Sequence, residues 1–229
     1  ALNPVHSIGK QVAEPLRLHR GASREQARHK AIALLDRVGI DNAARRFDAY
    51  PHQFSGGQRQ RITIAMALAC GPDLLIADEP TTALDVTVQR QILDLISELV
   101  HERQMALLLI SHDLGVIAQN TARMLVMYGG RVVEGGPSAQ VFTQIAHPYT
   151  VGLFAARPRL GARRGERLQT IAGTVPQLHE LTALCPFASR CGVALPACAA
   201  QAPIASDLGG GHSAHCLRLE GPHQQGTAQ

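Results

Sequence analysis

Aromatic residues and lysines are scarce in this sequence, which has no tryptophan, three tyrosines, five phenylalanines and only two lysines. Few aromatic rings means few platforms on which nucleic-acid bases could stack. The 22 basic residues, nearly all arginine, stand against 18 acidic ones, and a net charge of +4 is weak evidence for an anionic partner. We therefore expect an ordinary solvated surface and no nucleic-acid partner.

Long hydrophobic runs are missing as well. No stretch approaches the ~20 consecutive apolar residues that a membrane-spanning helix needs, and residues 1–6 show neither the charged nor the apolar part of a signal peptide. There is no initiator methionine, so we expect that the start is a truncation. With 229 residues, 45% of them hydrophobic, the chain is still long enough to bury a core.

A glycine-rich phosphate-binding loop of the form GxxxxGK[ST] is a further absence. Gly9-Lys10 is the only Gly-Lys pair, but Gln11 follows it where serine or threonine belongs, and Pro4 stands at the place of the first glycine. We interpret Gly9-Lys10 as the plain start of a helix.

Hydrophobic spacing predicts alternating helices and strands. Ser23 is a predicted helix N-cap with Gln26 as its capping-box partner, and a second helix is predicted from about residue 58 to 69. The short apolar runs 74–77 and 106–110 are typical of strands buried on both faces of a parallel sheet, with a helical stripe between them. Strands that alternate with helices indicate an α/β domain.

The predicted α/β domain covers residues 1–156, with a helical part over about 1–70 and a strand-rich part over 71–156. The second part contains a predicted β-hairpin around Gly129-Gly130. Arginine, proline and glycine then dominate, so a solvated linker is expected from residue 157. The remainder, to residue 229, is rich in Pro, Ala, Gly and Cys and predicts a small loop-rich appendage.

The first motif that carries chemistry is Phe54-Ser55-Gly56-Gly57-Gln58, at the start of the second predicted helix. The two glycines let the backbone approach an anion closely, and the free N–H groups and dipole of a helix start attract phosphate. Ser55 adds a hydroxyl donor. The alternative is a Ser-Gly-Gly turn that merely starts a helix.

Ionisable residues stand where the two short strands end. Asp78 and Glu79 terminate the first strand, at a sheet edge where nucleotide sites form. Asp78 can hold Mg²⁺ through water, and Glu79 can act as a general base toward an attacking water. His112, just after the second strand, can donate a hydrogen bond to a γ-phosphate. Taken one at a time, each is also compatible with a polar residue that only faces solvent.

The order and spacing of these segments resemble the ATP-hydrolysing domain of ABC transporters. Residues 54–58 resemble the signature motif, 74–79 the Walker B strand, Ala83-Leu84-Asp85 the D-loop, and Ser111-His112-Asp113 the switch-histidine motif. The resemblance covers residues 1 to about 140. It implies an α/β, P-loop NTPase-like ABC ATPase domain with a helical subdomain, here partial because the phosphate loop is missing.

Further segments resemble the dipeptide/oligopeptide branch of ABC importers. They are Ala1-Leu2-Asn3-Pro4, Tyr50-Pro51-His52-Gln53, His147-Pro148-Tyr149-Thr150, Gly173-Thr174-Val175-Pro176 and the cysteine-rich tail. The branch implies an ATPase that energises import of di- or oligopeptides, peripheral on the cytoplasmic face of the bacterial inner membrane. Its implied partners are a second ABC ATPase subunit, two transmembrane permease subunits and a periplasmic or extracellular substrate-binding protein. Nickel and glutathione importers share parts of this pattern.

In the family that these motifs resemble, two ATPase domains close head to tail around two ATP molecules. The resemblance implies that Glu79 is the base, Asp78 the Mg²⁺ holder, His112 the γ-phosphate sensor and Asp85 an organiser of the dimer interface. Residues 55–58, that is Ser55, Gly56, Gly57 and Gln58, are then expected to bind the ATP of the partner domain. Without a phosphate loop, the chain alone is expected to be inactive. The rival hypotheses are a soluble ABC ATPase not tied to transport and a non-catalytic adaptor.

Four of the five cysteines gather near the end, and they are Cys185, Cys191, Cys198 and Cys216, separated by 5, 6 and 17 residues. Clustered thiols without a secretory signal favour metal ligands over disulfides. The spacing is not that of common zinc sites, and four thiolates suit either zinc or an iron–sulfur cluster. His212 and His215 are spare zinc ligands, and unligated thiols are the third alternative. The resembled importer branch can carry a four-iron cluster on such a tail, which favours [4Fe–4S].

Overall fold

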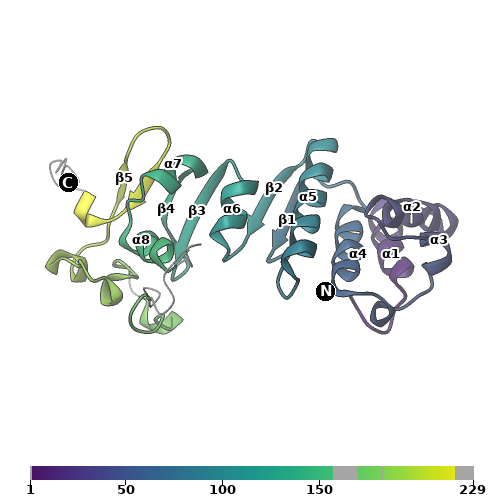
Figure 1. Ribbon diagram of the computed structural model, residues 1–229, viewed down its shortest axis with the longest axis horizontal. Coiled ribbons are helices and arrows are strands. Elements are labelled where there is room, and N and C mark those ends of the chain that lie inside the picture. Colours follow the sequence, from purple (N-terminus) through teal and green to yellow (C-terminus); the bar gives the residue numbers. More distant parts are fainter. Residues whose placement is uncertain (1, 157–169, 182, 220–229) are drawn as a thin grey trace. The chain divides into compact units, whose positions relative to one another are not determined.

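The computed structural model describes residues 2–156, 170–181 and 183–219 (Figure 1). The chain forms two compact units, residues 1–112 and 113–229. The sequence places its main boundary near residue 156 instead, inside the second unit. The predicted arginine-rich linker, which begins at residue 157, lies outside the described residues.

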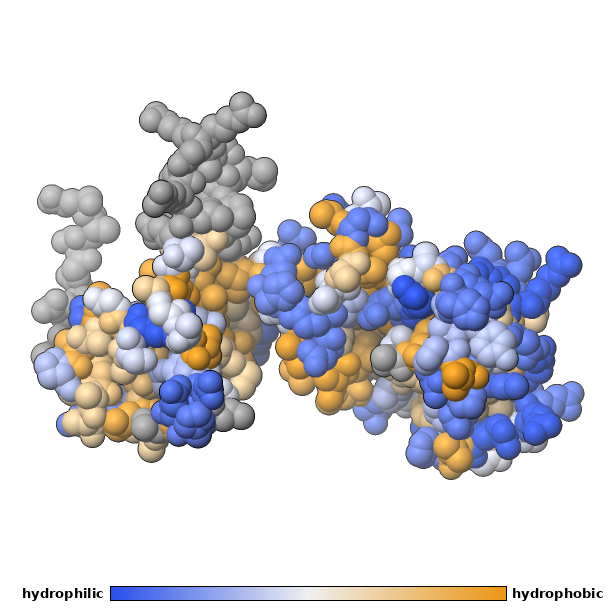
Figure 2. Space-filling view, turned by 90° about the horizontal axis from the view of Figure 1, so that it is seen from below, coloured by the Kyte–Doolittle hydropathy of each residue, from blue (hydrophilic) through white to orange (hydrophobic). Residues whose placement is uncertain are grey.

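Four helices form the N-terminal part of the first unit. They are α1 (Ile8–Arg20), α2 (Arg24–Arg37), α3 (Ala43–Arg46) and α4 (Gly56–Leu68). Helix α1 packs on α2 and on α4, and the face of this part that Figure 2 shows is mostly hydrophilic. The predicted capping box of α2 is confirmed, because Ser23 Oγ accepts from the Gln26 N–H at 3.2 Å and Gln26 Oε1 accepts from the Ser23 N–H at 3.0 Å.

The glycine of Gly9-Lys10 has a packing role inside α1. A Cβ added at Gly9 would collide with the ring of Phe47, which packs against this turn of the helix. Glycine therefore allows a close approach here. The interpretation of Gly9-Lys10 as part of a plain helix start is confirmed, since α1 begins at Ile8.

A parallel strand pair completes the first unit. Strands β1 (Leu74–Asp78) and β2 (Ala106–Ile110) are joined by α5 (Val86–Glu102) and pair in register from Leu74 with Ala106 to Asp78 with Ile110. The parallel pair and its helical crossover agree with the sequence-based prediction. Helix α5 buries the apolar stripe Ile92, Leu93, Leu95, Ile96 and Leu99.

The prediction that these strands are buried on both faces is wrong for the described residues. Leu75 and Ala77 are buried, whereas every second side chain of β1 points to an exposed face. The exposed apolar side chains of the pair are Leu74, Ile76, Leu108 and Ile110, with exposed fractions of 48, 59, 47 and 44%. Figure 2 shows hydrophobic residues gathered on the surface of this part. Among the described residues, therefore, only one face of the pair is covered.

The second unit begins with helix α6 (Leu114–Asn120) and the antiparallel strands β3 (Arg123–Tyr128) and β4 (Arg131–Pro137). The predicted hairpin around Gly129-Gly130 is confirmed, and both glycines take the left-handed conformation, with φ of 56° and 75°. Helices α7 (Ser138–Thr143) and α8 (Pro148–Ala155) follow. No helix among the described residues is both long enough and apolar enough to span a membrane.

The C-terminal region extends this hairpin into a larger sheet. Strands β5 (Ala205–Asp207) and β6 (Ser213–His215) give the order β3-β4-β6-β5, in which all neighbours are antiparallel. Short 3-10 turns at 178–180, 188–190 and 196–199 lie in the loop-rich stretch before them. The sequence predicts a small loop-rich appendage in this region, and two of its residues, in β6, pair with β4 of the hairpin.

An aromatic cluster also joins residues on both sides of position 156. The Tyr128 ring lies 4.7 Å from the ring of Tyr149 and 5.3 Å from that of Phe187, measured between centroids. The Arg190 guanidinium donates to the Tyr128 hydroxyl at 3.2 Å and to the Ile171 carbonyl oxygen at 3.0 Å. These contacts hold described residues from both sides of position 156 together in the second unit.

Candidate functional site

The carboxyl ends of β1 and β2 meet at one edge of the strand pair in the first unit. Their register sets Asp78 opposite Ile110, and the Glu79 N–H donates to the Ile110 carbonyl oxygen at 3.0 Å. His112 follows β2 by two residues. Because the strands are parallel, the structure brings Glu79 and His112 into contact directly beside Asp78, where the sequence places all three.

Both oxygens of the Glu79 carboxylate accept hydrogen bonds. Oε1 accepts from the His112 backbone N–H at 3.0 Å and lies 2.8 Å from the His112 Nδ1, while Oε2 accepts from the Thr82 hydroxyl at 3.0 Å. The bond from the His112 side chain is the main cause that holds the pKa of Glu79 below its ordinary value, and burial acts in the opposite direction. Glu79 is therefore a charged and oriented carboxylate at neutral pH.

Water and substrate can reach this carboxylate. The side chain of Glu79 is 35% exposed and that of His112 is 81% exposed. Asp78 is exposed at the end of β1. A carboxylate that accepts a proton, a second carboxylate one residue away and an exposed imidazole form a set that can position water next to a phosphate group.

The predicted anion-binding segment forms the start of α4. Ser55 is the N-cap, its Oγ accepts from the Gln58 N–H at 3.3 Å, and Gln58 Oε1 accepts from the Ser55 N–H at 3.1 Å. A Cβ added at Gly57 would lie 2.6 Å from Cγ1 of Val88. Glycine is thus required at this position for packing, in addition to any approach of the backbone to an anion.

Asp85 lies close to the same contact. It caps α5, and its Oδ1 accepts from the Val88 N–H at 2.9 Å. The residue before it in this loop, Leu84, has a side-chain methyl 3.3 Å from the position of a Cβ on Gly56. The start of α4 therefore packs against the start of α5. Asp85 has this local structural role in the chain, whatever else it contacts in an assembly.

The four C-terminal cysteines line one small cavity in the second unit. Cys185, Cys191, Cys198 and Cys216 share it with His147 and Phe187. Burial raises the pKa of the Cys185 and Cys216 thiols, so both are protonated at neutral pH when no metal is bound. In the described part of the chain, no group of three or more His, Cys, Asp or Glu side chains is arranged to hold a metal ion. The structure thus gathers the predicted cysteines without arranging them as ligands.

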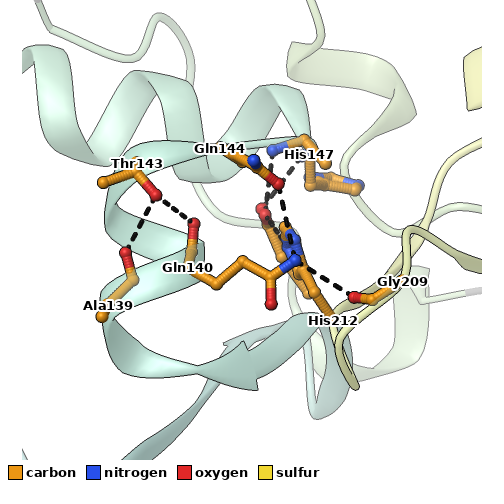
Figure 3. A network of polar contacts seen from close by, with 9 residues as sticks. Ala139, Gln140, Thr143, Gln144, His147, Gly209 and His212 are labelled. Carbon is orange, nitrogen blue, oxygen red and sulfur yellow. Dashed lines mark hydrogen bonds and ion pairs between the residues drawn. The ribbon is translucent and has the colours of Figure 1, made fainter.

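A buried polar network, which the sequence does not single out, lies in the same unit (Figure 3). Glu134 on β4 is fully buried, and its carboxylate accepts from the N–H groups of Ala146 at 2.8 Å and His147 at 2.9 Å. Oε1 also lies 2.9 Å from Nε2 of His212, which is fully buried as well. His212, expected as a spare zinc ligand, is thus a partner of Glu134. A lone glutamate between Val133 and Gly135 in a predicted hairpin gave the only hint of this network.

Two known sequence families match the chain. Residues 2–82 match the family described as ABC transporter, and residues 133–198 match the family described as oligopeptide/dipeptide transporter, C-terminal region. The first segment contains residues 54–58 and the strand-end carboxylates. The second contains Glu134, His147 and three of the four clustered cysteines.

Curated relatives cover nearly the whole chain. A protein of Brucella melitensis, whose name describes it as a peptide import ATP-binding protein, is 54% identical over 225 residues, which is 96% of this chain and 67% of the relative. The chain belongs to the oligopeptide/dipeptide family of ABC transporter ATP-binding proteins. A second member, from Brucella abortus, is 51% identical over 215 residues, or 94% of this chain and 64% of the relative. The chain thus spans about two thirds of the length of these curated relatives.

A solved structure agrees with the fold of this ABC transporter protein. It is a dimeric ATP-binding cassette in a post-hydrolysis state, bound to ADP and phosphate. The match has a TM-score of 0.52 and 32% sequence identity over 60% of this chain and 59% of that chain. The α/β ABC ATPase fold that the motifs imply is therefore confirmed.

Proposed function

We propose that this chain supplies the general base, the γ-phosphate sensor and the signature segment of an ATPase that drives peptide import. The observation that carries the proposal is the contact of Glu79 with His112 beside Asp78, at the ends of two parallel strands of an ABC cassette. In this assignment Glu79 takes a proton from the attacking water. The exposed imidazole of His112 contacts the γ-phosphate.

ATP and Mg²⁺ are the cofactors of the proposed reaction. The residues present fit a hydrated magnesium ion, because Asp78 offers an exposed carboxylate next to Glu79, and oxygen is the ligand that Mg²⁺ prefers. When bound with ATP, the ion neutralises charge on the phosphates. Residues 55–58 are assigned to the ATP of a partner cassette, because they open a 13-residue helix whose N-terminal dipole favours an anion.

The proposed assembly is an importer complex. It contains a second ABC ATPase subunit, two transmembrane permease subunits and a periplasmic or extracellular substrate-binding protein, with the ATPase on the cytoplasmic face of the inner membrane. The match of residues 133–198 to the oligopeptide/dipeptide C-terminal region supports a peptide substrate over nickel or glutathione. The same match argues against a soluble ABC ATPase that is not tied to transport.

The cysteine cavity is proposed as a structural metal centre. Four thiols around one cavity are the donor set of a [4Fe–4S] cluster or of tetrahedral zinc, so the residue types fit either group. A bound centre would cross-link this loop-rich stretch. Because the four sulfur atoms are not arranged as ligands here, binding of a metal centre requires the loops that carry the cysteines to bring these atoms closer together. The proposal rests on the cysteines alone, since the descriptions of the matched families name no metal.

The assignment of the base is tested with Glu79→Gln in the complete ATP-binding subunit. We expect the variant to bind ATP as the wild type does and to lose at least about a hundredfold in turnover, because a general base contributes 10² to 10⁴. Steady-state hydrolysis and nucleotide binding are measured side by side. Glu102→Gln, which changes an exposed carboxylate at the far end of α5, is the control and should hydrolyse ATP normally. Normal turnover by Glu79→Gln would remove the assignment.

A further inference from the structure

The two oxygens of the Glu79 carboxylate are held by different parts of the first unit. Oε1 is held by His112, which follows strand β2, through its backbone N–H and its imidazole. Oε2 is held by the hydroxyl of Thr82, three residues further along the same loop. In the proposed mechanism the His112 imidazole leaves Oε1 and contacts the γ-phosphate of ATP. The Thr82 hydroxyl has no such second role and stays on Oε2.

The local backbone explains why Thr82 reaches back to Glu79. Glu79 takes the left-handed conformation, with φ of 48°, which is rare for a residue other than glycine. The chain therefore turns sharply, and the Thr82 N–H donates to the Glu79 carbonyl oxygen at 3.2 Å. Pro80 and Thr81, the two residues inside the turn, are buried and anchor it. The hydroxyl of Thr82 is thereby placed at Oε2 by the same turn that presents the carboxylate.

The Thr82 hydroxyl, as the donor to Oε2, limits rotation of the Glu79 carboxylate. The terminal torsion of glutamate is broad, so a carboxylate without fixed donors can rotate about its last bond. Two donors on Oε1 fix that oxygen, but when the imidazole leaves only the backbone N–H of His112 remains there. A donor on Oε2 then keeps the plane of the carboxylate fixed. Small losses of alignment at a reacting centre are costly in rate.

We propose that Thr82 is a positioning residue for ATP hydrolysis, which holds Oε2 of Glu79 so that Oε1 faces the attacking water. The inference rests on the proposed role of Glu79 as base. In the step itself, the water oxygen forms a bond to the γ-phosphorus and one water proton passes to Oε1. The bond from the γ-phosphorus to the bridging oxygen breaks, and its electron pair leaves on ADP. The proton on Oε1 then returns to phosphate or solvent.

The test compares two substitutions of Thr82 in the complete ATP-binding subunit. Thr82→Val keeps the shape and removes the hydroxyl, whereas Thr82→Ser keeps the hydroxyl. We expect Thr82→Val to lower kcat about tenfold with KM for ATP changed less than about twofold, because a hydrogen bond to a charged group is lost at the reacting carboxylate. Thr82→Ser should stay within about twofold of the wild type. A merely structural residue would give neither the split between kcat and KM nor the rescue by serine.

Controls separate this inference from the function on which it rests. Thr87→Val makes the same chemical change at an exposed threonine in the first turn of α5 and should leave kcat unchanged. Thr82 is itself exposed, so the thermal transitions of its variants should match that of the wild type. The role of Thr82 is wrong if Thr82→Val keeps the wild-type kcat, and also if Thr82→Ser loses as much kcat as Thr82→Val. In either case a loss of turnover in Glu79→Gln would leave the role of Glu79 intact. If Glu79→Gln hydrolyses ATP normally, both are wrong.

Discussion

Glu134 and His212 form a hydrogen-bonded pair in which neither side chain has any exposed surface, with 2.9 Å between Oε1 and Nε2. The pair joins β4 to the loop between β5 and β6, and that loop needs its glycines. Gly209, Gly210 and Gly211 all have positive φ, and a Cβ on Gly136 of β4 would lie 2.8 Å from the Cα of His212. A hydrogen bond without access to water thus links β4 to the loop between the two C-terminal strands.

Replacing His212 with alanine should destabilise the second unit strongly. Removal of the imidazole takes one hydrogen-bond donor from Glu134, which keeps only the N–H groups of Ala146 and His147, and it leaves an unfilled space in the interior. Together these losses should cost about 3 kcal/mol of the free energy of unfolding. Gln140→Ala is the matched control, because the Gln140 side chain donates to the Gly209 carbonyl oxygen of the same loop at 3.1 Å (Figure 3) but is partly exposed. We expect its cost to stay below about 1 kcal/mol. Urea unfolding followed by circular dichroism measures both, and equal effects of the two changes would contradict the role given to His212.

Protonation of the buried His147 imidazole should lower the free energy of unfolding as the pH falls. Burial lowers the pKa of His147 to about 4, from an ordinary value of 6.5, and its Nδ1 accepts from the Tyr149 N–H at 3.0 Å. Protonation would turn that acceptor into a donor. Between about pH 6.5 and 4 the unfolded chain binds the proton and the folded chain does not, so stability is lost as the pH decreases through this window. NMR titration of the imidazole should show the low pKa. An ordinary value near 6.5 would disprove the prediction.

This chain by itself should bind Mg-ATP weakly or not at all. It contains no GxxxxGK[ST] loop, which supplies backbone N–H donors and a lysine to the phosphates. Calorimetry with the wild-type chain is the measurement, and a dissociation constant weaker than about 100 μM is expected. Glu79→Gln serves as the control. It should bind Mg-ATP as weakly as the wild-type chain, because the missing loop and not the Glu79 carboxylate limits the affinity. Micromolar affinity would show that the chain holds nucleotide without that loop.

The cysteine cavity gives a prediction about metal content. Protein purified without oxygen should contain iron and acid-labile sulfide and absorb broadly near ~400 nm, as cysteine-ligated clusters do. Cys198→Ser should reduce the iron content, because Cys198 lines the cavity, whereas Cys70→Ser should not, because Cys70 lies in the first unit. Zinc without iron would exclude the cluster alone. Neither metal by elemental analysis would exclude a metal centre altogether.

The strand-end site could be predicted from the sequence because local patterns determine it. Two short apolar runs joined by a helical stripe imply parallel strands, and parallel strands place Glu79 and His112 at one edge. The capping boxes at Ser23 and Ser55 are local in the same sense. The contact of Thr82 with Glu79 could not be predicted from the sequence. It depends on a left-handed backbone conformation at Glu79, which glutamate rarely adopts.

The arrangement of the second unit could not be predicted for a different reason. The pairing of β4 with β6 joins residues about 80 positions apart in the sequence. Strands β5 and β6 are also only three residues long each. Strands of that length show no readable alternation. The partner of Glu134 is equally distant, and the histidine that supplies it stands among glycines that look like loop. The exposed face of β1 and β2 was mispredicted because apolar composition does not tell whether a covering layer is present.

The pairing of β4 with β6 limits how C-terminal regions can be exchanged between related transporters. The matched C-terminal family segment stops at residue 198, so a chimera cut there would combine Glu134 of one parent with the β6 strand and the position-212 residue of the other. The donor to the buried Glu134 carboxylate and the strand beside β4 would then both come from a sequence that did not evolve with them. A viable exchange has to include residues 199–216 with the segment that contains Glu134, because these two stretches fold as halves of one sheet.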